Sequence, residues 1–301
     1  MLVSTTISAL CKLTDIKDAI RITAEAGFDA FDMPFFGKTM ELFSGDDYVE
    51  KAKDLRKYAD GLGIVCNQAH APCPSSRPDL ETTKQIYKDI VRSMEVASVL
   101  GAKIIAVHPV QHLKYAEHPD ELFEMNVKFY KSLIPYCEKF GIRVGCENMW
   151  QDNSRTQAIT ESTCARAWEF CKYLDAVNSE WIVGCLDIGH VSLVNADIPE
   201  FIHKMGNKRL RALHIHDTDY VKDLHTMPFL GKIDYHAVCK ALGEIGYEGD
   251  VTFEADGYEN YGYANQFPLE LMPAAEKLLC SVGKYLASEI EKNRKNEREA
   301  I

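Results

Sequence analysis

The sequence of 301 residues lacks the features that would place it in a membrane or mark it for secretion. No apolar run approaches the roughly 20 residues that span a bilayer. The N-terminal segment MLVSTTISALCKLTD contains no basic stretch and reaches charged residues too early for a signal peptide. Apolar residues make up 46% of the chain, which is too much for a disordered protein. We therefore expect a folded, cytoplasmic protein with no membrane partner.

Positive charge is scarce. The chain has 34 Lys and Arg against 45 Asp and Glu, so its formal net charge is −11. Binding to nucleic acid depends on clustered Lys and Arg that contact phosphate groups. The overall balance therefore disfavours a nucleic-acid partner, although a local basic patch is compatible with an acidic total.

Paired cysteines are missing as well. The ten cysteines form no CxxC motif, and several of them lie within apolar runs. In a chain of this length without a secretion signal, buried reduced thiols are favoured over disulfides or a zinc ribbon. A catalytic cysteine–histidine pair is the less favoured alternative.

Short apolar runs alternate with longer amphipathic segments along the whole chain. The short runs are nearly continuously apolar, which is typical of buried parallel strands. They cover residues 2–8, 28–34, 63–70, 102–109, 142–148, 182–190, 210–217 and 250–256. The longer segments repeat apolar residues at steps of three and four, which is typical of helices. They cover residues 16–27, 47–61, 84–100, 120–139, 161–175, 197–206, 235–245 and 266–293.

Eight strands, each followed by a helix, predict an α/β fold with parallel strands and right-handed crossovers. Eight such units in a chain of this length indicate a closed (β/α)8 TIM barrel. No linker or low-complexity tract divides the chain, so we expect a single domain over residues 1–301. An open doubly wound sheet is the alternative, but the GxGxxG turn it would carry after the first strand is absent.

Ionisable side chains gather at the carboxyl ends of the predicted strands and in the loop that follows the seventh. Catalytic residues of barrel enzymes lie at these ends. Six of the ten histidines are among them. The residues are His70, His108, Glu147, Asp187, His190, His214, His216, Asp217, Asp223, His225, Glu254 and Asp256.

Carboxylates that close buried strands are costly unless they are paired or bound to a metal ion. The smallest set that predicts a divalent-cation site is Glu147, Asp187, His214 and Glu254. One imidazole and three carboxylates suit Mn²⁺, Mg²⁺, Co²⁺, Fe²⁺ or Zn²⁺. The alternative, that each residue is a satisfied polar group or a helix cap, remains open for the other strand-end residues taken singly.

Several motifs resemble the xylose-isomerase-like TIM-barrel superfamily of sugar isomerases and epimerases. They are CEN (146–148), LDIGH (186–190), LHIHD (213–217), GKID (231–234) and GYEGDVTFE (246–254). The resemblance covers essentially the whole chain. It implies that His214 is a metal ligand, and that Glu147 and Glu254 bind the metal and handle protons. It also implies that His190 contacts the substrate.

The reaction that the resemblance implies is proton abstraction next to the carbonyl of a ketose or related cyclitol, with a divalent ion stabilising the enediolate. Glu147 and Glu254 are then the bases of an isomerase or epimerase of carbohydrate metabolism. A dehydratase of the inosose type is a related outcome. The expected substrate contacts are His70, His108, His190, His216, Asp223 and His225. A homodimer or homotetramer is common in the superfamily.

The same superfamily includes the type IV apurinic endonucleases (endonuclease IV), which bind three zinc ions. Nearly all of their ligand pattern is present in this chain, so such a nuclease is the main alternative. The few and scattered basic residues near the strand ends argue against it. A non-catalytic sugar-binding barrel is a third class.

The sequence departs from the family pattern at the second strand. Many sugar enzymes of the family end this strand with Glu, whereas this chain has Asp32. The aromatic segment 33–46 that follows is either a lid over the mouth or a packed surface loop. Trp150 either walls a sugar pocket or serves packing alone.

Overall fold

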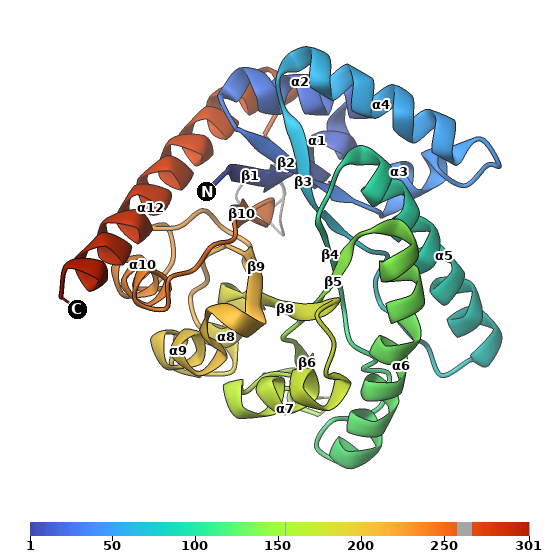
Figure 1. The fold of residues 1–301 in the computed structure, drawn as a ribbon, viewed down its shortest axis with the longest axis vertical. Helices are drawn as coiled ribbons and strands as arrows, with labels where there is room; N and C mark the ends of the chain where they lie inside the picture. The colour runs from blue at the N-terminus through green and yellow to red at the C-terminus, as the bar shows by residue number, and fades with distance from the viewer. Residues whose placement is uncertain (154, 258–266, 301) are drawn as a thin grey trace.

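A computed structural model describes residues 1–153, 155–257 and 267–300, with side chains described as far as residue 294. Eight parallel strands form a ring in the order β10-β1-β2-β3-β4-β5-β8-β9 (Figure 1). Their bounds are β1 (Val3–Thr6), β2 (Ala30–Pro34), β3 (Val65–His70), β4 (Ile104–Val107), β5 (Arg143–Glu147), β8 (Ile182–Asp187), β9 (Leu210–His214) and β10 (Val251–Phe253). The predicted (β/α)8 barrel is confirmed.

The ring closes between β9 and β10. The amide of Ile215 donates to the carbonyl of Thr252 at 2.9 Å, and the amide of Glu254 donates to the carbonyl of Ile215 at 3.1 Å. These parallel-sheet bonds join the last strand pair without an open edge. All carboxyl ends therefore surround one mouth.

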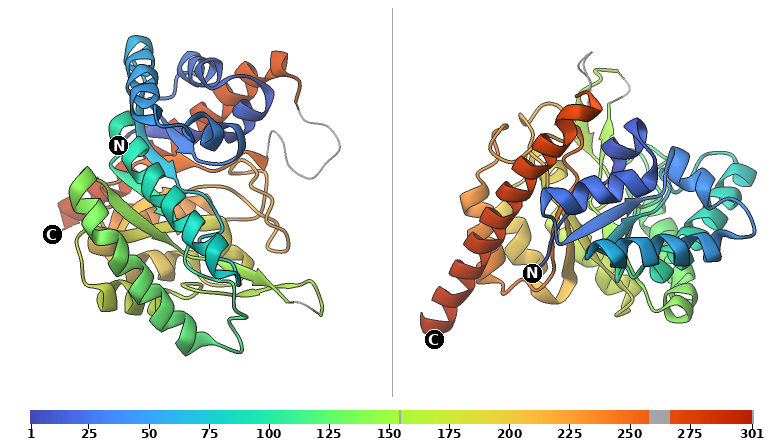
Figure 2. Two further views of the ribbon diagram at one scale, coloured as in Figure 1. Left: turned by 90° about the vertical axis from the view of Figure 1, so that its right-hand side faces the viewer. Right: turned by 90° about the horizontal axis from the view of Figure 1, so that it is seen from above.

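Long helices cover the outside of the ring. They are α2 (Ile16–Ala26), α4 (Tyr48–Leu62), α5 (Leu80–Leu100), α6 (Pro119–Phe140), α7 (Ala167–Val177), α9 (Ile198–Arg209), α10 (Tyr235–Glu244) and α12 (Met272–Ala300). Aspartate side chains cap the first turns of α2, α5, α9 and α10 by accepting backbone N–H bonds. Gly101 ends α5 with φ at 107°, a conformation that glycine adopts at little cost. Helix α12 packs against α2 and α10 (Figure 2).

Several boundaries differ from the prediction by a few residues, and two of these differences have a clear cause. The sixth predicted strand ends at Asp187, because the Asp187 side chain accepts the amide of His190 and thereby starts the short helix α8 (Ile188–Leu193). The helix expected from residue 161 begins at Ala167, because β6 (Trp150–Asp152) and β7 (Ile159–Glu161) pair as an antiparallel hairpin. This hairpin projects from the barrel as a narrow arm (Figure 2).

Two further short helices were not predicted: α1 (Ser8–Leu13) and α3 (Gly37–Leu42). Helix α3 lies in the aromatic segment after β2. Phe35 and Phe43 flank it and pack edge to face in the core, with 6.0 Å between ring centroids. Phe36 instead lines the mouth of the barrel and contacts the ring of His70. The segment is therefore anchored by two aromatics and contributes one to the mouth.

Candidate active site

A cavity of about 550 Å³ opens at the carboxyl ends of the strands. Eight of the strand-end residues named from the sequence line it: His70, His108, Glu147, His190, Asp223, His225, Glu254 and Asp256. Three others lie beneath its floor, where Asp187 and His216 are 0% exposed and His214 is 1% exposed. The structure therefore brings the predicted site residues to one mouth, in two layers. Asp217 is the exception, because its buried carboxylate accepts the backbone amides of Thr218, Phe229 and Ile233.

The centre of the mouth is the group Glu147, Asp187, His214 and Glu254, which come from the ends of β5, β8, β9 and β10. Each offers one ligand atom, and these atoms all lie within 4.8 Å of one another. His214 Nδ1 is 3.1 Å from Glu147 Oε1 and 3.2 Å from Glu254 Oε2. Two carboxylates and one imidazole nitrogen thus converge on a single point.

A second group adjoins the first and shares Glu147 with it. His70 at the end of β3 and His108 just after β4 place their Nε2 atoms 3.1 Å apart. The Oε2 atom of Glu147 lies 3.4 Å from His108 Nε2 and 3.6 Å from His70 Nε2. The Nδ1 atom of His70 contacts the carbonyl of Ala71 at 2.8 Å, which requires Nδ1 to donate. In the neutral ring the Nε2 lone pair therefore faces Glu147 and His108.

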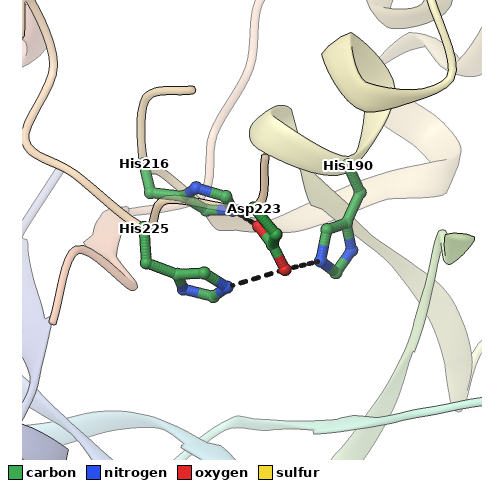
Figure 3. A group of neighbouring side chains, drawn as sticks. All are labelled: His190, His216, Asp223 and His225. Atoms are coloured by element: carbon green, nitrogen blue, oxygen red, sulfur yellow. Dashed lines mark hydrogen bonds and ion pairs between the residues drawn. The ribbon is translucent and has the colours of Figure 1, made fainter. Parts of the chain in front are cut away.

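A third group consists of His190, His216, Asp223 and His225. Figure 3 shows Asp223 between two imidazoles, with Oδ2 3.3 Å from His225 Nε2 and 3.6 Å from His190 Nε2. Backbone carbonyls orient both rings, because His190 Nδ1 contacts the carbonyl of Asn148 and His225 Nδ1 contacts that of Glu254, each at 2.8 Å. Both Nε2 atoms are thereby directed at one carboxylate.

His216 belongs to this group but faces Asp187. Its Nε2 lies 3.0 Å and 3.1 Å from the two carboxylate oxygens of Asp187. Its ring stacks on that of His225, with centroids 4.0 Å apart and planes at 4°. His216 therefore fixes the orientation of Asp187 from below the cavity.

The third group also holds unusual protonation states. Burial by itself favours a neutral imidazole, but the carboxylates of Asp187 and Asp223 raise the pKa of His190 to about 10. Burial favours a protonated Asp223, but the charge of His225 and the bond with His190 hold the pKa of Asp223 well below its usual value.

The same balance applies at the centre. Burial opposes ionisation of Glu147, but the charges of His214 and His108 hold its pKa well below the usual range. Burial also opposes a charged His214, but the neighbouring groups, first Cys185 and then Glu254, hold its pKa well above the ordinary value. Without another cation present, the histidines themselves supply the positive charge that these carboxylates need.

The donor set fits a divalent metal ion. Glu147 Oε2 and Asp223 Oδ1 are buried and have no hydrogen-bond partner within the described ranges. Such orphaned carboxylate oxygens are costly in a folded protein and are satisfied when they coordinate a cation. Imidazole nitrogens and carboxylate oxygens in these proportions suit zinc, manganese, cobalt or iron, and magnesium less well.

Sequence reasoning missed two polar side chains that shape the site. Gln68 Nε2 donates to Asp32 Oδ2 at 3.0 Å, and that oxygen lies 3.8 Å from His214 Nε2. Asp32 therefore lies beside His214 and does not line the cavity. Asn148 bonds the backbone of Asp187. Asn148 stands in the CEN motif next to Glu147, and this adjacency is the signal that could have identified it.

The rim carries the remaining polar groups. Trp150 lines the cavity, and its Nε1 donates to Asp223 Oδ2 at 3.3 Å. Lys12, from α1, lies 3.8 Å from Asp256 Oδ2. Among the described lining residues, Lys12 is the only Lys or Arg, and it faces five carboxylates: Glu147, Asp152, Asp223, Glu254 and Asp256.

Fold and site together define a TIM-barrel protein with a candidate metal centre at the carboxyl ends of its strands. Residues 20–275 match the family described as "Xylose isomerase-like TIM barrel", so the chain belongs to that family. D-psicose 3-epimerase of Ruminiclostridium cellulolyticum is 22% identical over 259 residues, covering 80% of this chain and 78% of the epimerase. Fructoselysine 3-epimerase of Escherichia coli O157:H7 is 22% identical over 244 residues, covering 79% of this chain and 85% of that enzyme.

Solved structures agree on the fold. The IolI protein, whose structure carries a bound zinc atom, superimposes with a TM-score of 0.74 at 19% identity and covers 97% of this chain and 99% of IolI. In the described part of the chain, no helix is long and apolar enough to cross a membrane.

Proposed function

We propose that the chain is a divalent-metal-dependent isomerase or epimerase of a ketose or a related cyclitol. The observation that carries this proposal is the approach of two glutamates to one imidazole nitrogen, His214 Nδ1. Glu147 and Glu254 come from β5 and β10, which are not neighbours in the ring. They can therefore reach a bound substrate from two directions. Similarity to two sugar 3-epimerases supports the assignment.

The two glutamates would act as a base and an acid in turn. One carboxylate removes the proton next to the carbonyl, and the other returns a proton to the opposite face or to the neighbouring carbon. The depressed pKa of Glu147 keeps it ionised near neutral pH, which is the state that a base requires. Removal of water from the same intermediate would give a dehydratase.

A divalent ion would be held by Glu147, Asp187, His214 and Glu254. When bound, it supplies Lewis-acid stabilisation of the negative charge that develops on the substrate oxygens. Asp187 is oriented for this role by His216 and by the amide of Asn148. The rigid floor keeps the four ligand side chains in place while the substrate enters from the cavity.

The lining histidines would orient the hydroxyl groups of the substrate. His70, His108, His190 and His225 reach the cavity together with Asp223. His216 does not line it, so we assign His216 to the orientation of Asp187. A single lysine among five carboxylates favours an uncharged polyol over a sugar phosphate. The homo-oligomer and the cytoplasmic location expected from the sequence stay predictions.

Exchange of substrate protons with solvent tests the proposal. The purified chain, after elemental analysis of its metal content, is incubated in D₂O with a panel of ketoses and cyclitol ketones. Proton NMR should show loss of the signal next to the carbonyl with at least one substrate. If no substrate exchanges after loading with each of Mn²⁺, Mg²⁺, Co²⁺, Fe²⁺ and Zn²⁺, the chain is not an enzyme of this type.

A specific observation keeps an apurinic-site nuclease with a multinuclear zinc site as the second candidate. Four candidate ligand groups, the fourth made of His70, His214 and Glu254, overlap or adjoin one another in the described part of the chain, and Glu147 belongs to two of them. The nuclease predicts three zinc ions per chain and cleavage of a duplex with an abasic site. The single lysine at the mouth argues against it, because a DNA backbone requires several cations. Cleavage of the abasic duplex without deuterium exchange would favour the nuclease.

A further inference from the structure

A second cavity, of about 430 Å³, opens at the opposite end of the barrel, where the strands begin. It shares no lining residue with the mouth cavity. The small side chains Ala106, Cys185 and Ala212, from β4, β8 and β9, pack together with Ile104 between these two ends. The two cavities are therefore separate sites.

The second cavity is rich in positive charge. Its charged lining residues are Arg56, Lys103, Arg143, Arg211, Glu248 and Asp250. Four cations thus face two carboxylates, in a chain whose formal net charge is −11. The mouth cavity has the opposite balance, so the barrel is acidic at one end and basic at the other. A concave surface with one sign of charge concentrates ions of the opposite sign.

Two of these cations, Arg56 and Arg211, have a structural role. Arg56 Nη1 donates to the carbonyl of Leu100 at 3.1 Å, at the C-terminus of α5. Arg211 Nη1 contacts the carbonyl of Asn207 and Glu248 Oε2, each at 3.4 Å. Cations at helix C-termini stabilise the exposed carbonyl groups there. These two guanidinium groups are therefore explained without a ligand.

Lys103 and Arg143 have no such structural role. Neither side chain makes a hydrogen bond or an ion pair with any residue in the described part of the chain. Arg143 begins β5, four residues before Glu147, so both side chains lie on the same face of the strand. Arg143 therefore stands at the amino end of the strand that supplies Glu147 at the mouth. Two unpaired cations that line one cavity repel each other, and a bound anion would remove this cost.

The carboxylates in the cavity do not compensate these cations. Asp250 accepts the amide of Leu2 at 2.8 Å and Nδ2 of Asn67 at 3.0 Å. The Oδ1 atom of Asn67 is buried without a hydrogen-bond partner among the described residues. Asn67 lines the same cavity, so this oxygen is an unsatisfied acceptor for a ligand hydroxyl group.

We propose that this cavity binds a phosphoryl group, and that Lys103 and Arg143 are its principal ligands. A phosphate dianion presents oxygens in several directions, and the guanidinium fork of an arginine pairs with two of them. The volume exceeds the needs of phosphate alone and leaves room for an attached hydroxylated group that can donate to Asn67. The site lies away from the mouth, so this proposal stands or falls separately from the proposed function.

Isothermal titration of the purified chain tests the site with three probes: inorganic phosphate, fructose 6-phosphate and fructose. The test variant is Lys103→Ala/Arg143→Ala. The matched control is Lys128→Ala/Arg155→Ala, which removes the same two charges from exposed positions elsewhere. Thermal unfolding confirms that each variant folds. Lys103→Glu, at an exposed position, serves as a second test if the double variant does not fold.

We expect one phosphate per chain with a dissociation constant of about 1 mM or tighter, and weakening by at least about tenfold in the test variant. The control variant should bind as the unaltered chain does, and fructose should show no binding that depends on Lys103 and Arg143. Fructose 6-phosphate binding more tightly than phosphate would identify a phosphorylated sugar as the ligand, and equal affinity would identify phosphate itself. Absence of phosphate binding, or equal affinity in the test variant and the unaltered chain, would overturn the proposal.

Discussion

The side-chain amide of Asn148 bonds both backbone polar groups of Asp187. Asn148 Nδ2 donates to the Asp187 carbonyl at 2.9 Å, and the Asp187 amide donates to Asn148 Oδ1 at 2.8 Å. Both residues are almost completely buried. This pair of bonds joins the end of β5 to the end of β8, the two strands that carry Glu147 and Asp187 of the central group. It therefore fixes the position of the Asp187 backbone at the site.

Asn148→Ala should therefore lower both stability and metal affinity. It removes two hydrogen bonds from the buried backbone of Asp187, at a cost of about 1–3 kcal/mol in the free energy of unfolding. The metal dissociation constant should rise by about 10–100-fold, as for other residues that orient ligands. Urea unfolding and metal titration measure the two effects. Asn153→Ala, at an exposed position, is the control, and an unchanged metal affinity in Asn148→Ala would contradict the role.

Gly189→Ala should disturb the floor of the site. A Cβ atom at Gly189 would overlap the ring of His216, which is stacked on His225 and bonded to Asp187. Overpacking of this kind costs about 1–3 kcal/mol in the free energy of unfolding. Metal affinity should fall with it, because His216 can no longer hold Asp187.

Gly61→Ala is the matched control for that substitution. Gly61 lies in α4, and a Cβ atom there meets nothing within 4 Å. Alanine is preferred over glycine in a helix by about 1 kcal/mol, so this variant should be neutral or slightly more stable. Equal stability of the two variants in urea unfolding would show that the His216 ring moves aside without cost.

Glu147→Gln and Glu254→Gln should each abolish proton exchange. Each replaces a carboxylate base with an amide of the same shape, and loss of a general base typically lowers the rate by about 100–10,000-fold. Deuterium incorporation from D₂O measures the rate, and circular dichroism verifies the fold. Glu138→Gln, an exposed position on α6, should retain the full rate. A normal rate in either site variant would exclude that glutamate as a base.

Metal binding should release protons near neutral pH. The pKa of His214 and of His225 is held well above the usual value, and that of His190 is raised to about 10, so these rings are protonated before a cation binds. A protonated imidazole cannot coordinate a metal ion. Each ring that coordinates a metal ion must lose its proton, so metal affinity should increase as the pH rises.

Calorimetric titration of metal in two buffers with different ionisation enthalpies measures this release. We expect about one proton or more per bound ion throughout about pH 6 to pH 8, whereas unperturbed histidine, with a pKa of about 6.5, would release almost none at pH 8. His118→Ala, at the exposed start of α6, should leave the number unchanged. A metal affinity that does not vary over this pH range would contradict the raised pKa values.

The fold was largely predictable from local pattern. Nearly continuous apolar runs identify parallel strands, and residues such as Val144 and Ile105 are buried on the face toward the helices, as that pattern requires. The main differences between predicted and observed boundaries lie at a helix cap and at a hairpin. Asp187 ends β8 by capping α8, and the segment after Trp150 turns back as a hairpin. Strand periodicity contains no information about either event.

The sequence by itself determined which chemistry is available. Histidines and carboxylates at the strand ends must share one mouth once the strands are parallel and the ring is closed, because all carboxyl ends then point the same way. Hence the candidate metal ligands were found from their positions alone. The long sequence separations between Glu147, Asp187, His214 and Glu254 did not prevent this inference.

Only the tertiary structure determined which of these residues line the cavity and which lie beneath its floor. It placed His216 beneath the floor and His225 at the cavity, although both were predicted to contact the substrate. It also placed Lys103 and Arg143 at the far end of the barrel, away from the carboxylates of the mouth. Layering, stacking and the separation of charge depend on distances between strands that are remote in the chain. A linear pattern cannot specify such distances, because they are set by how the whole ring packs.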